Sequence, residues 1–183
     1  MKFLFLIHFF YFWETKNLLY IKLPFITFKL MEKTLVIIKP GAIQRELIGE
    51  IITRFERKGL HLCGIKMYQF TDKVVSEHYA HLADRPFFKR IKDSMMVTPV
   101  IVCCWEGLDA VRIVRSMSGV TNGREAAPGT IRGDFSMSVQ ENIVHASDTV
   151  ENAKIEIDRF FKPEEIFEFK PNNFSFVYAN DEV

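Results

Sequence analysis

The sequence predicts an α+β sandwich, in which helices pack against a small sheet. Short apolar runs rich in β-branched residues alternate with segments whose apolar residues recur every three or four positions, so strands and helices are mixed along the chain. The strands are few and are not separated by regular strand–helix units, which favours a sandwich over a doubly wound parallel sheet. The 183 residues suit one domain of this kind with a substantial core.

Composition and charge are typical of an ordinary globular protein in a reducing compartment. Hydrophobic residues make up 48% and charged residues 26%, which argues against a disordered chain. The formal net charge of +1 gives no support for a protein that coats nucleic acid. Cys63, Cys103 and Cys104 form no CxxC pair and no even disulfide set. We therefore expect buried free thiols and a cytoplasmic location.

The first 30 residues differ from the rest and form an apolar leader. They hold seven of the 18 Phe residues, four Lys and one Glu, and neither Gly nor Ala. The apolar stretch Phe3–Trp13 is shorter than the about 20 residues of a membrane-spanning helix. Lys2 precedes it as in a signal peptide, but no small-residue cleavage site follows. Either Met31 is the natural start and the leader is dispensable, or the leader serves targeting or membrane contact; we divide the chain into residues 1–30 and a domain of residues 31–183.

The domain is predicted to begin with a strand, a helix and a second strand. Thr34–Ile38 is a β-branched run that ends at the turn-forming sequence Lys39-Pro40-Gly41, as a buried strand does. From Leu47 to Phe55 the apolar residues share one helical face, and Gly59 ends the helix after two basic residues. Leu60–Phe70 is predicted as the second strand.

Two short helices follow, Lys73–Leu82 and Pro86–Met96, with Asp84 as a candidate cap of the second. Val100–Trp105 is a continuous apolar run bounded by Pro and Gly, which predicts a central strand. Leu108–Met117 has helical spacing and is predicted as the next helix.

The last third of the domain combines a long loop with a final strand and helix. Thr121–Val139 shows no lasting periodicity, and a loop of that length in a compact domain is usually functional or disordered. Ile143–His145 predicts a short strand. The helix Val150–Phe160 follows, and Asp148 with Glu151 matches a capping box at its start.

Common motifs for phosphate, zinc and acyl chemistry are absent from the sequence. It contains no GxxxxGK[ST], GxGxxG, HExxH or GxSxG pattern. His78 and His81 are three residues apart on a predicted helix, but they belong to no closely spaced Cys/His ligand set. We therefore expect solvated or partly packed histidines there, and no metal held by protein side chains.

His145 is the strongest candidate for covalent chemistry. It leaves a strand three residues before Asp148, where the helix is predicted to start and the helix dipole is positive. That potential disfavours the imidazolium, keeps the ring neutral and nucleophilic, and favours a bound anion such as phosphate. On these residues alone, the alternative is a loop histidine beside a well-capped helix.

Three cations and an aromatic pair complete the candidates. Lys39 ends a strand, Arg115 takes an apolar position on a helical stripe, and Arg132 lies between two glycines. Each alone is more typical of a surface cation or an ion pair. Phe87 and Phe88 are adjacent at a helix start and cannot share one core site, so either both pack in different places or one is a stacking platform for a base.

Six sequence blocks carry a resemblance to a known family. They are Thr34-Leu35-Val36-Ile37-Ile38-Lys39-Pro40, Gly49-Glu50-Ile51-Ile52-Thr53-Arg54-Phe55-Glu56, Glu77-His78-Tyr79-Ala80-His81-Leu82, Arg85-Pro86-Phe87-Phe88, Pro128-Gly129-Thr130-Ile131-Arg132-Gly133-Asp134-Phe135 and Asn142-Ile143-Val144-His145-Ala146-Ser147-Asp148. Over residues 33–169 the chain resembles the nucleoside diphosphate kinases. The last two blocks, in this order and at this spacing, are highly specific to that family.

The resemblance implies a ferredoxin-like α+β sandwich with a small antiparallel sheet. It implies transfer of the γ-phosphate of a nucleoside triphosphate, mainly ATP, to a nucleoside diphosphate by a ping-pong route through a phosphohistidine, with Mg²⁺ held by the nucleotide phosphates. By match to the motifs, His145 is the nucleophile through its pros nitrogen and Phe87 stacks on the base. The matched nucleotide-binding positions are Lys39, Arg115, Thr121, Arg132 and Asn142, and the supporting positions around the histidine are Tyr79, Ser147 and Glu156.

Elementary chemistry agrees with these roles. Phosphoryl transfer makes large electrostatic demands, which the three cations would meet. A neutral imidazole attacks with one nitrogen, and the other nitrogen needs an acceptor that fixes the tautomer, here Glu156. Stacking on Phe87 alone reads no base edge, so we expect broad tolerance for the base.

The sequence departs from the family pattern at a few positions. Gly41-Ala42 stands where an acidic residue and Gly are usual, Gly123 where Pro is common, and Ala146 where Gly is commoner. None of these removes a charged or nucleophilic group, so we expect activity in a homo-oligomer, either a tetramer or a hexamer. The rival interpretation is a ferredoxin-like module that binds nucleotides or nucleic acid without turnover, although the near-neutral charge weighs against nucleic acid. Membrane contact is expected only if the leader is part of the native protein.

Overall fold

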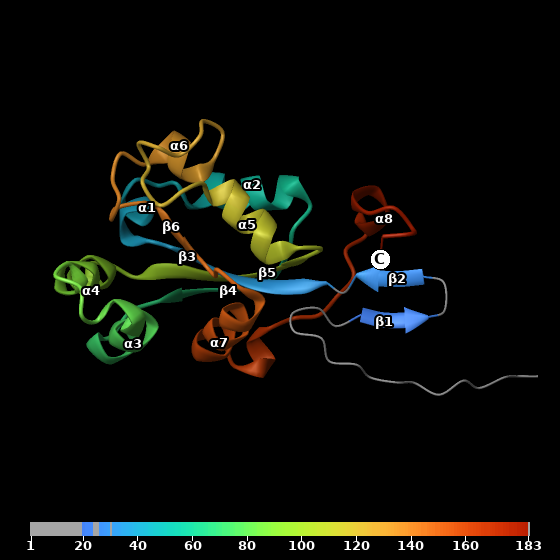
Figure 1. Ribbon diagram of the computed structural model, residues 1–183, viewed down its shortest axis with the longest axis horizontal. Coiled ribbons are helices and arrows are strands. Elements are labelled where there is room, and N and C mark those ends of the chain that lie inside the picture. The colour runs from blue at the N-terminus through green and yellow to red at the C-terminus, as the bar shows by residue number, and fades with distance from the viewer. Residues whose placement is uncertain (1–19, 24–25, 30, 183) are drawn as a thin grey trace, which may run out of the picture.

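The computed structural model describes residues 20–23, 26–29 and 31–182 (Figure 1). β1 (Tyr20–Leu23) and β2 (Ile26–Lys29) pair antiparallel as a separate two-stranded sheet. Within these ranges, no helix has the length and apolar character needed to cross a membrane. The stretch Phe3–Trp13, on which the interpretation of the leader depends, lies outside the described residues, so both alternatives for the leader stay open.

Four antiparallel strands form the central sheet in the order β4–β5–β3–β6. They are β3 (Glu32–Ile38), β4 (His61–Tyr68), β5 (Val100–Gly107) and β6 (Val144–Ala146). Side chains on both faces of β3 and β5 are buried, which explains why these two strands are continuous apolar runs. All four predicted strands of the domain are confirmed, with small differences at their ends.

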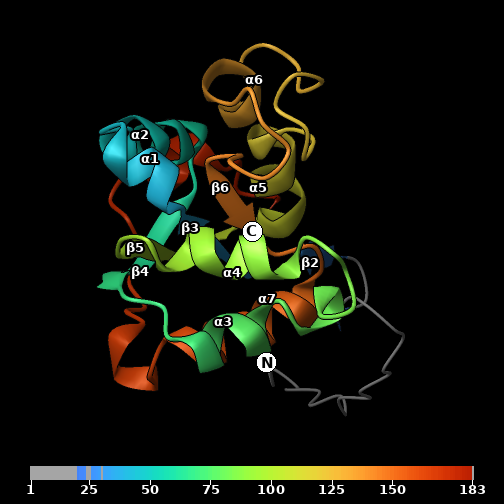
Figure 2. The same ribbon diagram turned by 90° about the vertical axis from the view of Figure 1, so that its left-hand side faces the viewer.

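Helices cover both faces of this sheet (Figure 2). One face carries α1 (Pro40–Gln44), α2 (Ile48–Lys58), α5 (Ala110–Ser118) and α6 (Ile131–Phe135), and the other carries α3 (Asp72–His78), α4 (Phe88–Met96) and α7 (Val150–Phe160). Phe55 and Trp105 lie in the buried cluster on the first face, and Leu35 and Phe160 in the cluster on the second. The short elements η1 (Ala80–Leu82), η2 (Pro163–Glu165) and α8 (Phe174–Val177) complete the described domain, and the predicted α+β sandwich is confirmed.

Two helix starts differ from the prediction. α4 begins after Phe87 with no side-chain hydrogen bond at its cap, so the prediction of Asp84 as its cap is wrong. At α7 the cap is Thr149, whose hydroxyl accepts a hydrogen bond from the backbone N–H of Asn152. A hydroxyl in extended backbone directly before a helix satisfies one of the unpaired N–H groups of the first turn. Asp148, predicted as this cap, instead accepts a hydrogen bond from the side chain of Asn152.

Local structure also differs in three segments predicted from sequence. Pro40 opens the short helix α1 rather than a turn, because its fixed φ suits the first position of a helix. The long loop contains α6, capped by the hydroxyl of Thr130. The helix predicted over Lys73–Leu82 is interrupted at Tyr79, where α3 gives way to the tighter η1. The cysteines are free and buried, as predicted.

Candidate active site

A cleft of about 1380 Å³ opens beside α3 and α4, facing β6 and the loop that precedes it. It gathers residues that are far apart in the sequence. Nine of the ten predicted site residues line it, namely Lys39, Tyr79, Phe87, Arg115, Thr121, Arg132, Asn142, His145 and Glu156. The tenth, Ser147, is buried and hydrogen-bonded to one of them.

The position of His145 in its strand determines where its side chain points. His145 is the middle residue of β6 and lies opposite Ile37 of β3. Its neighbours Val144 and Ala146 contribute to the buried cluster under α2 and α5. Because side chains alternate along a strand, the His145 ring faces the opposite side of the sheet, where α3 and α7 lie.

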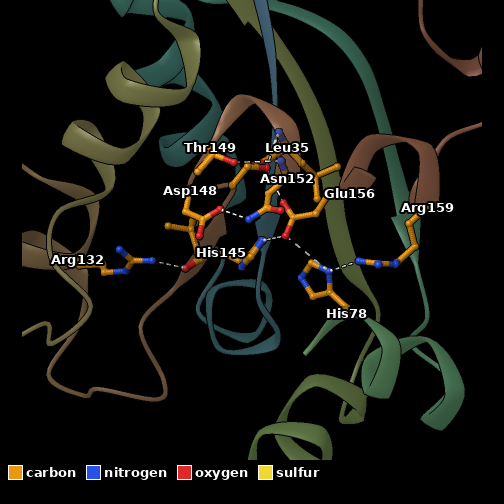
Figure 3. Close-up of polar contacts among 11 residues, drawn as sticks. Leu35, His78, Arg132, His145, Asp148, Thr149, Asn152, Glu156 and Arg159 are labelled. Atoms are coloured by element: carbon orange, nitrogen blue, oxygen red, sulfur yellow. Dashed lines mark hydrogen bonds and ion pairs between the residues drawn. The ribbon is translucent and has the colours of Figure 1, made fainter. Parts of the chain in front are cut away.

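Glu156 of α7 fixes the orientation of the imidazole (Figure 3). Its Oε1 lies 2.9 Å from Nε2 of His145, and its Oε2 accepts a hydrogen bond of 2.5 Å from the hydroxyl of Ser147. An ionised carboxylate only accepts hydrogen bonds, so Nε2 carries the proton and Nδ1 keeps its lone pair. Burial raises the pKa of the Glu156 carboxyl, but the hydrogen bonds from His145 and Ser147 outweigh it and hold the pKa below its ordinary value.

A strained turn leads into this strand. Ile143 has φ 72°, a left-handed conformation that a β-branched residue rarely adopts. The N–H of Val144 donates to the carbonyl of Asn142 across it at 2.8 Å, which closes a γ-turn. The carbonyl of Ile143 accepts from the N–H of Lys39 at 2.9 Å, so the turn is tied to the end of β3. Such strain persists only where the surroundings enforce it, and here it sets the start of the strand that bears His145.

Arg132 is held by backbone carbonyls alone. Its Nε donates to Asn142 O at 3.2 Å, Nη1 to Gly119 O at 2.6 Å and Nη2 to Val144 O at 2.7 Å. Burial lowers the pKa of the guanidinium to about 10, and the charge of Arg115 acts in the same direction. All three partners are neutral oxygens, so the positive charge is fixed in place but not neutralised by them.

Lys39 is a second cation without a carboxylate in its hydrogen bonds. Its Nζ donates to Oδ1 of Asn142 at 2.6 Å and to the carbonyl of Gln140 at 3.4 Å. Burial, helped by the charge of Arg132, lowers the pKa of Lys39 to about 8. Asn142 is itself fixed, because its Nδ2 donates to the carbonyls of Thr121 and Val139. The charge of Glu141 opposes this lowering of the Lys39 pKa, but Glu141 does not bond to Nζ, so two partly buried cations have no carboxylate among their hydrogen bonds and favour an anion between them.

The remaining predicted residues lie nearer to solvent. Arg115 of α5 and Thr121 of the following loop are exposed and line the cleft. Phe87 is 39% exposed and also lines the cleft, whereas Phe88 packs against the buried cluster on the α3 and α7 side. The structure thus separates the two rings, because Phe88 packs in the core and Phe87 is partly exposed in the cleft, where stacking on a base stays a prediction.

Sequence reasoning missed the environment of His78. Expected to be solvated or partly packed, it is buried at the end of α3, and its ring centroid lies 4.5 Å from that of His145. Burial lowers the pKa of His78 to about 3, and the nearby charge of His145 adds to this effect. The helical spacing to Val75, three residues earlier on the buried face of α3, is the signal that could have indicated this burial.

One cluster in the described ranges has the geometry of a metal site. Ligand atoms of His78, His145 and Glu156 lie within 4.8 Å of one another. Two imidazoles and one carboxylate are ligands for zinc rather than for Mg²⁺, which prefers oxygen ligands and retained waters. Arg159 donates a hydrogen bond to Nδ1 of His78, which places a cation against the same nitrogen. These residues therefore do not fit Mg²⁺.

Comparison with known families and proteins places this geometry in context. The family model described as nucleoside diphosphate kinase matches residues 32–166. Over 152 residues the chain is 67% identical to the nucleoside diphosphate kinase of Parabacteroides distasonis, covering 83% of this chain and 99% of that protein. It is 52% identical to the nucleoside diphosphate kinase of Pyrococcus horikoshii over 141 residues, which cover 75% of this chain and 90% of that protein.

Solved structures show the same fold. The structure of a halophilic nucleoside diphosphate kinase from Halobacterium salinarum in complex with CDP matches with a TM-score of 0.80 and 39% identity, over 82% of this chain and 100% of that one. A nucleoside diphosphate kinase family protein from Babesia bovis matches with a TM-score of 0.77 and 42% identity, over 80% of this chain and 99% of that one.

Proposed function

The chain belongs to the nucleoside diphosphate kinase family, and we propose that its His145 carries the phosphoryl group from one nucleotide to the other. It is a nucleoside diphosphate kinase in activity and a ferredoxin-like sandwich in fold, so the rival interpretation of a binding module without turnover falls away. The observation that carries the proposal is the bond between Nε2 of His145 and Glu156, which leaves Nδ1, the pros nitrogen, for attack.

The proposed ping-pong route has two half-reactions. Nδ1 of His145 attacks the γ-phosphorus of a nucleoside triphosphate, mainly ATP. The N–P bond forms, the P–O bond to the β-phosphate breaks, and the diphosphate leaves with the electron pair. The phosphorylated ring is cationic, and its Nε2–H still donates to Glu156, whose negative charge stabilises the ring. An oxygen of the β-phosphate of a second diphosphate then attacks the phosphorus, the N–P bond breaks, and its electron pair returns to Nδ1. Neither half-reaction needs a general base, because neither Nδ1 nor the ionised phosphate oxygen bears a proton when it attacks.

The cations of the cleft support binding of a polyphosphate. Arg132 and Lys39 are held in place before any nucleotide arrives, so they need little reorganisation to stabilise negative charge. Arg115 would add a third charge from the exposed wall, and Thr121 and Asn142 would add neutral donors.

Two aromatic residues would contact the nucleotide at different points. Burial raises the pKa of the Tyr79 hydroxyl, which has no hydrogen-bond partner in the described part of the chain. A phosphoryl group on His145 would give that hydroxyl an acceptor. Phe87 would stack on the base. Stacking makes no hydrogen bond to the edge of the base, so it supports tolerance for many bases.

Mg²⁺ is proposed to enter with the substrate. The nucleotide phosphates would hold it, because the cluster of His78, His145 and Glu156 has imidazole ligands that Mg²⁺ does not favour. The chemistry the ion supplies when bound is neutralisation of the polyphosphate charge.

A homo-oligomer is proposed from exposed apolar side chains on an outer strand of the sheet. β4 is an edge strand of the described sheet, and its side chains Ile65 and Met67 are 47% and 62% exposed, although the N–H of Phe167 already donates to the carbonyl of Cys63 on that edge. Exposed apolar side chains on an edge strand favour association with another chain. Whether the assembly is a tetramer or a hexamer stays a prediction, as does the cytoplasmic location.

The carrier role of His145 is tested by trapping the phosphoenzyme. The protein is incubated with γ-labelled ATP and no acceptor, and the label on protein is followed. We expect acid-labile, base-stable label that moves to GTP when GDP is added. His145→Ala should carry no label.

The matched control is His61→Ala, since His61 lies on β4, outside the cleft, with its ring against Phe169. This variant should label like the unaltered protein. Label that survives in His145→Ala would assign the carrier role to another residue.

A further inference from the structure

Arg159 of α7 does not pair with Glu156, although their spacing favours a pair. The two residues are three apart on one helix, a separation at which side chains are neighbours. Asp109, the residue before α5, and Arg112 have the same order and the same separation in sequence, and their Oδ2 and Nη2 atoms lie 2.8 Å apart. Arg159 instead donates from Nη1 to Nδ1 of His78 at 3.3 Å.

His78 lies between this cation and the carboxylate (Figure 3). Its Nδ1 is 3.3 Å from Nη1 of Arg159 and 3.8 Å from Oε1 of Glu156, so one nitrogen faces both charged groups. The His78 side chain is fully buried, and its ring packs edge-on against His145 and Tyr79. The ring therefore cannot leave this position without repacking the core.

The His78 ring is neutral at physiological pH. Its pKa of about 3 follows from burial and from the charges of His145, Arg159 and His81, which together outweigh the opposing charge of Glu156. Nδ1 accepts from Arg159, so the proton lies on Nε2, which is buried without a partner among the described residues. A neutral acceptor holds the guanidinium and brings no positive charge of its own to Glu156.

We propose that His78 is a positioning residue that keeps Arg159 away from Glu156, so that the carboxylate serves His145 and Ser147 alone. The proposal rests on the carrier role proposed for His145. Without an acceptor at the position of Nδ1, Arg159 is free to turn to Glu156 as Arg112 turns to Asp109. The carboxylate is then shared with a guanidinium, the tautomer of His145 is held less firmly, and the imidazolium formed in the attack is less stabilised.

Two nearly isosteric substitutions separate the acceptor from the ring. His78→Leu and His78→Asn both remove the imidazole and leave a similar space, but only Asn offers an oxygen near the position of Nδ1. We expect His78→Leu to slow phosphoenzyme formation by about tenfold, which is the low end of the losses seen when a group that orients a histidine is removed. The KM for ATP should stay within about twofold. His78→Asn should stay within about threefold of the unaltered protein.

A second substitution tests the part played by Arg159. In the His78→Leu background, Arg159→Met should recover most of the lost rate, because the competing cation is gone. The acid limb of the pH profile should move to lower pH in His78→Leu and return in the double variant. Arg112→Met removes the matched cation of α5 and should change neither rate nor profile.

Each outcome bears on the proposal. Equal losses in His78→Leu and His78→Asn, or no recovery in the double variant, would overturn it in favour of a packing role. NMR of the His145 ring nitrogens gives a readout that needs no turnover: the Nε2–H tautomer should dominate in the unaltered protein and be less populated in His78→Leu. If the unaltered protein forms no phosphoenzyme, the carrier role fails, and the tautomer still decides the function of His78.

Discussion

The two ends of the cleft are built in different ways. At the inner end, the functional atoms are fixed by the fold itself: Arg132 bonds three backbone carbonyls, and Glu156 holds both His145 and Ser147. At the outer end, Phe87 is 39% exposed and begins a helix that has no side-chain cap. The hydrogen bonds that join α4 to the opposite wall come from exposed side chains: Ser94 donates to Glu141, and Gln140 bonds both the side chain and the backbone carbonyl of Arg90.

This difference matches what each end has to recognise. Charge that develops on a transferring phosphoryl group is stabilised best by donors and cations that are already in position. A base that is only stacked needs a flat ring and tolerates many partners. The contrast predicts that inner substitutions remove chemistry, whereas outer substitutions weaken binding to a similar extent for every base.

The largest expected effect tests the inner end. His145→Ala should reduce phosphate exchange by on the order of 10⁶-fold, the loss that follows removal of a catalytic nucleophile. ADP binding should stay within a few-fold, because the ring is proposed to carry the group and not to bind the nucleotide. Exchange is measured by coupled assay and binding by calorimetry. Turnover near that of the unaltered protein would refute the mechanism, and a large loss of ADP affinity would make His145 a binding residue.

The inner end also shows what sequence alone could and could not predict. The site residues of both ends were predicted from the resemblance to the family, and nine of the ten line one cleft. Their contacts depend on tertiary packing: Glu156 lies deep in α7, and only the packing of α7 on β3 brings it to His145. The burial of His78 has a sequence signal in its helical spacing to Val75, but its contact with His145 depends on tertiary packing. The cap at Thr149 depends on local backbone geometry.

The central sheet was easier to predict than the helix ends. Strands β3 and β5 are buried on both faces, so their apolar runs indicate strands from any short window of sequence. Helix starts depend on which of several polar residues reaches a free N–H: of the adjacent candidates Asp148 and Thr149, only Thr149 accepts from the backbone N–H of Asn152. The positive φ of Ile143 has no sequence signal, because a β-branched residue is disfavoured there.

The next largest effect tests the outer end. Phe87→Ala should weaken nucleotide binding by about 1–3 kcal/mol, the usual loss for one stacked base. The loss should be similar for ADP, GDP and CDP, measured by calorimetry. Phe87→Trp keeps a stacking plane and serves as the control, with affinity close to that of the unaltered protein. A defect confined to one base would reveal readout of a base edge and contradict the stacking role.

A smaller effect is a pH dependence of ADP binding, which we expect from the partly buried Lys39 and not from the exposed residues of the cleft. The Lys39 pKa of about 8 in the free protein means that the ammonium is charged below that pH and neutral above it. A bound diphosphate favours the charged form, so the Kd for ADP should rise by up to about tenfold per pH unit above pH 8, with proton uptake on binding. Lys39→Arg keeps its charge over this range and should bind with little pH dependence. An equally steep profile in that variant would assign the titration to another group.

The smallest effect concerns the part of the chain that should contribute to neither end of the cleft. A protein that begins at Met31 is expected to melt at the same temperature and to keep its kcat/KM, because all ten site residues and the family match at residues 32–166 lie after that point. Loss of the aromatic leader should lower its tendency to associate, since exposed apolar surface promotes association. Calorimetry, steady-state kinetics and light scattering of the two proteins make the comparison. If the shorter protein lost its melting transition or its activity, the leader would be part of the fold, and the domain boundary proposed at Met31 would be wrong.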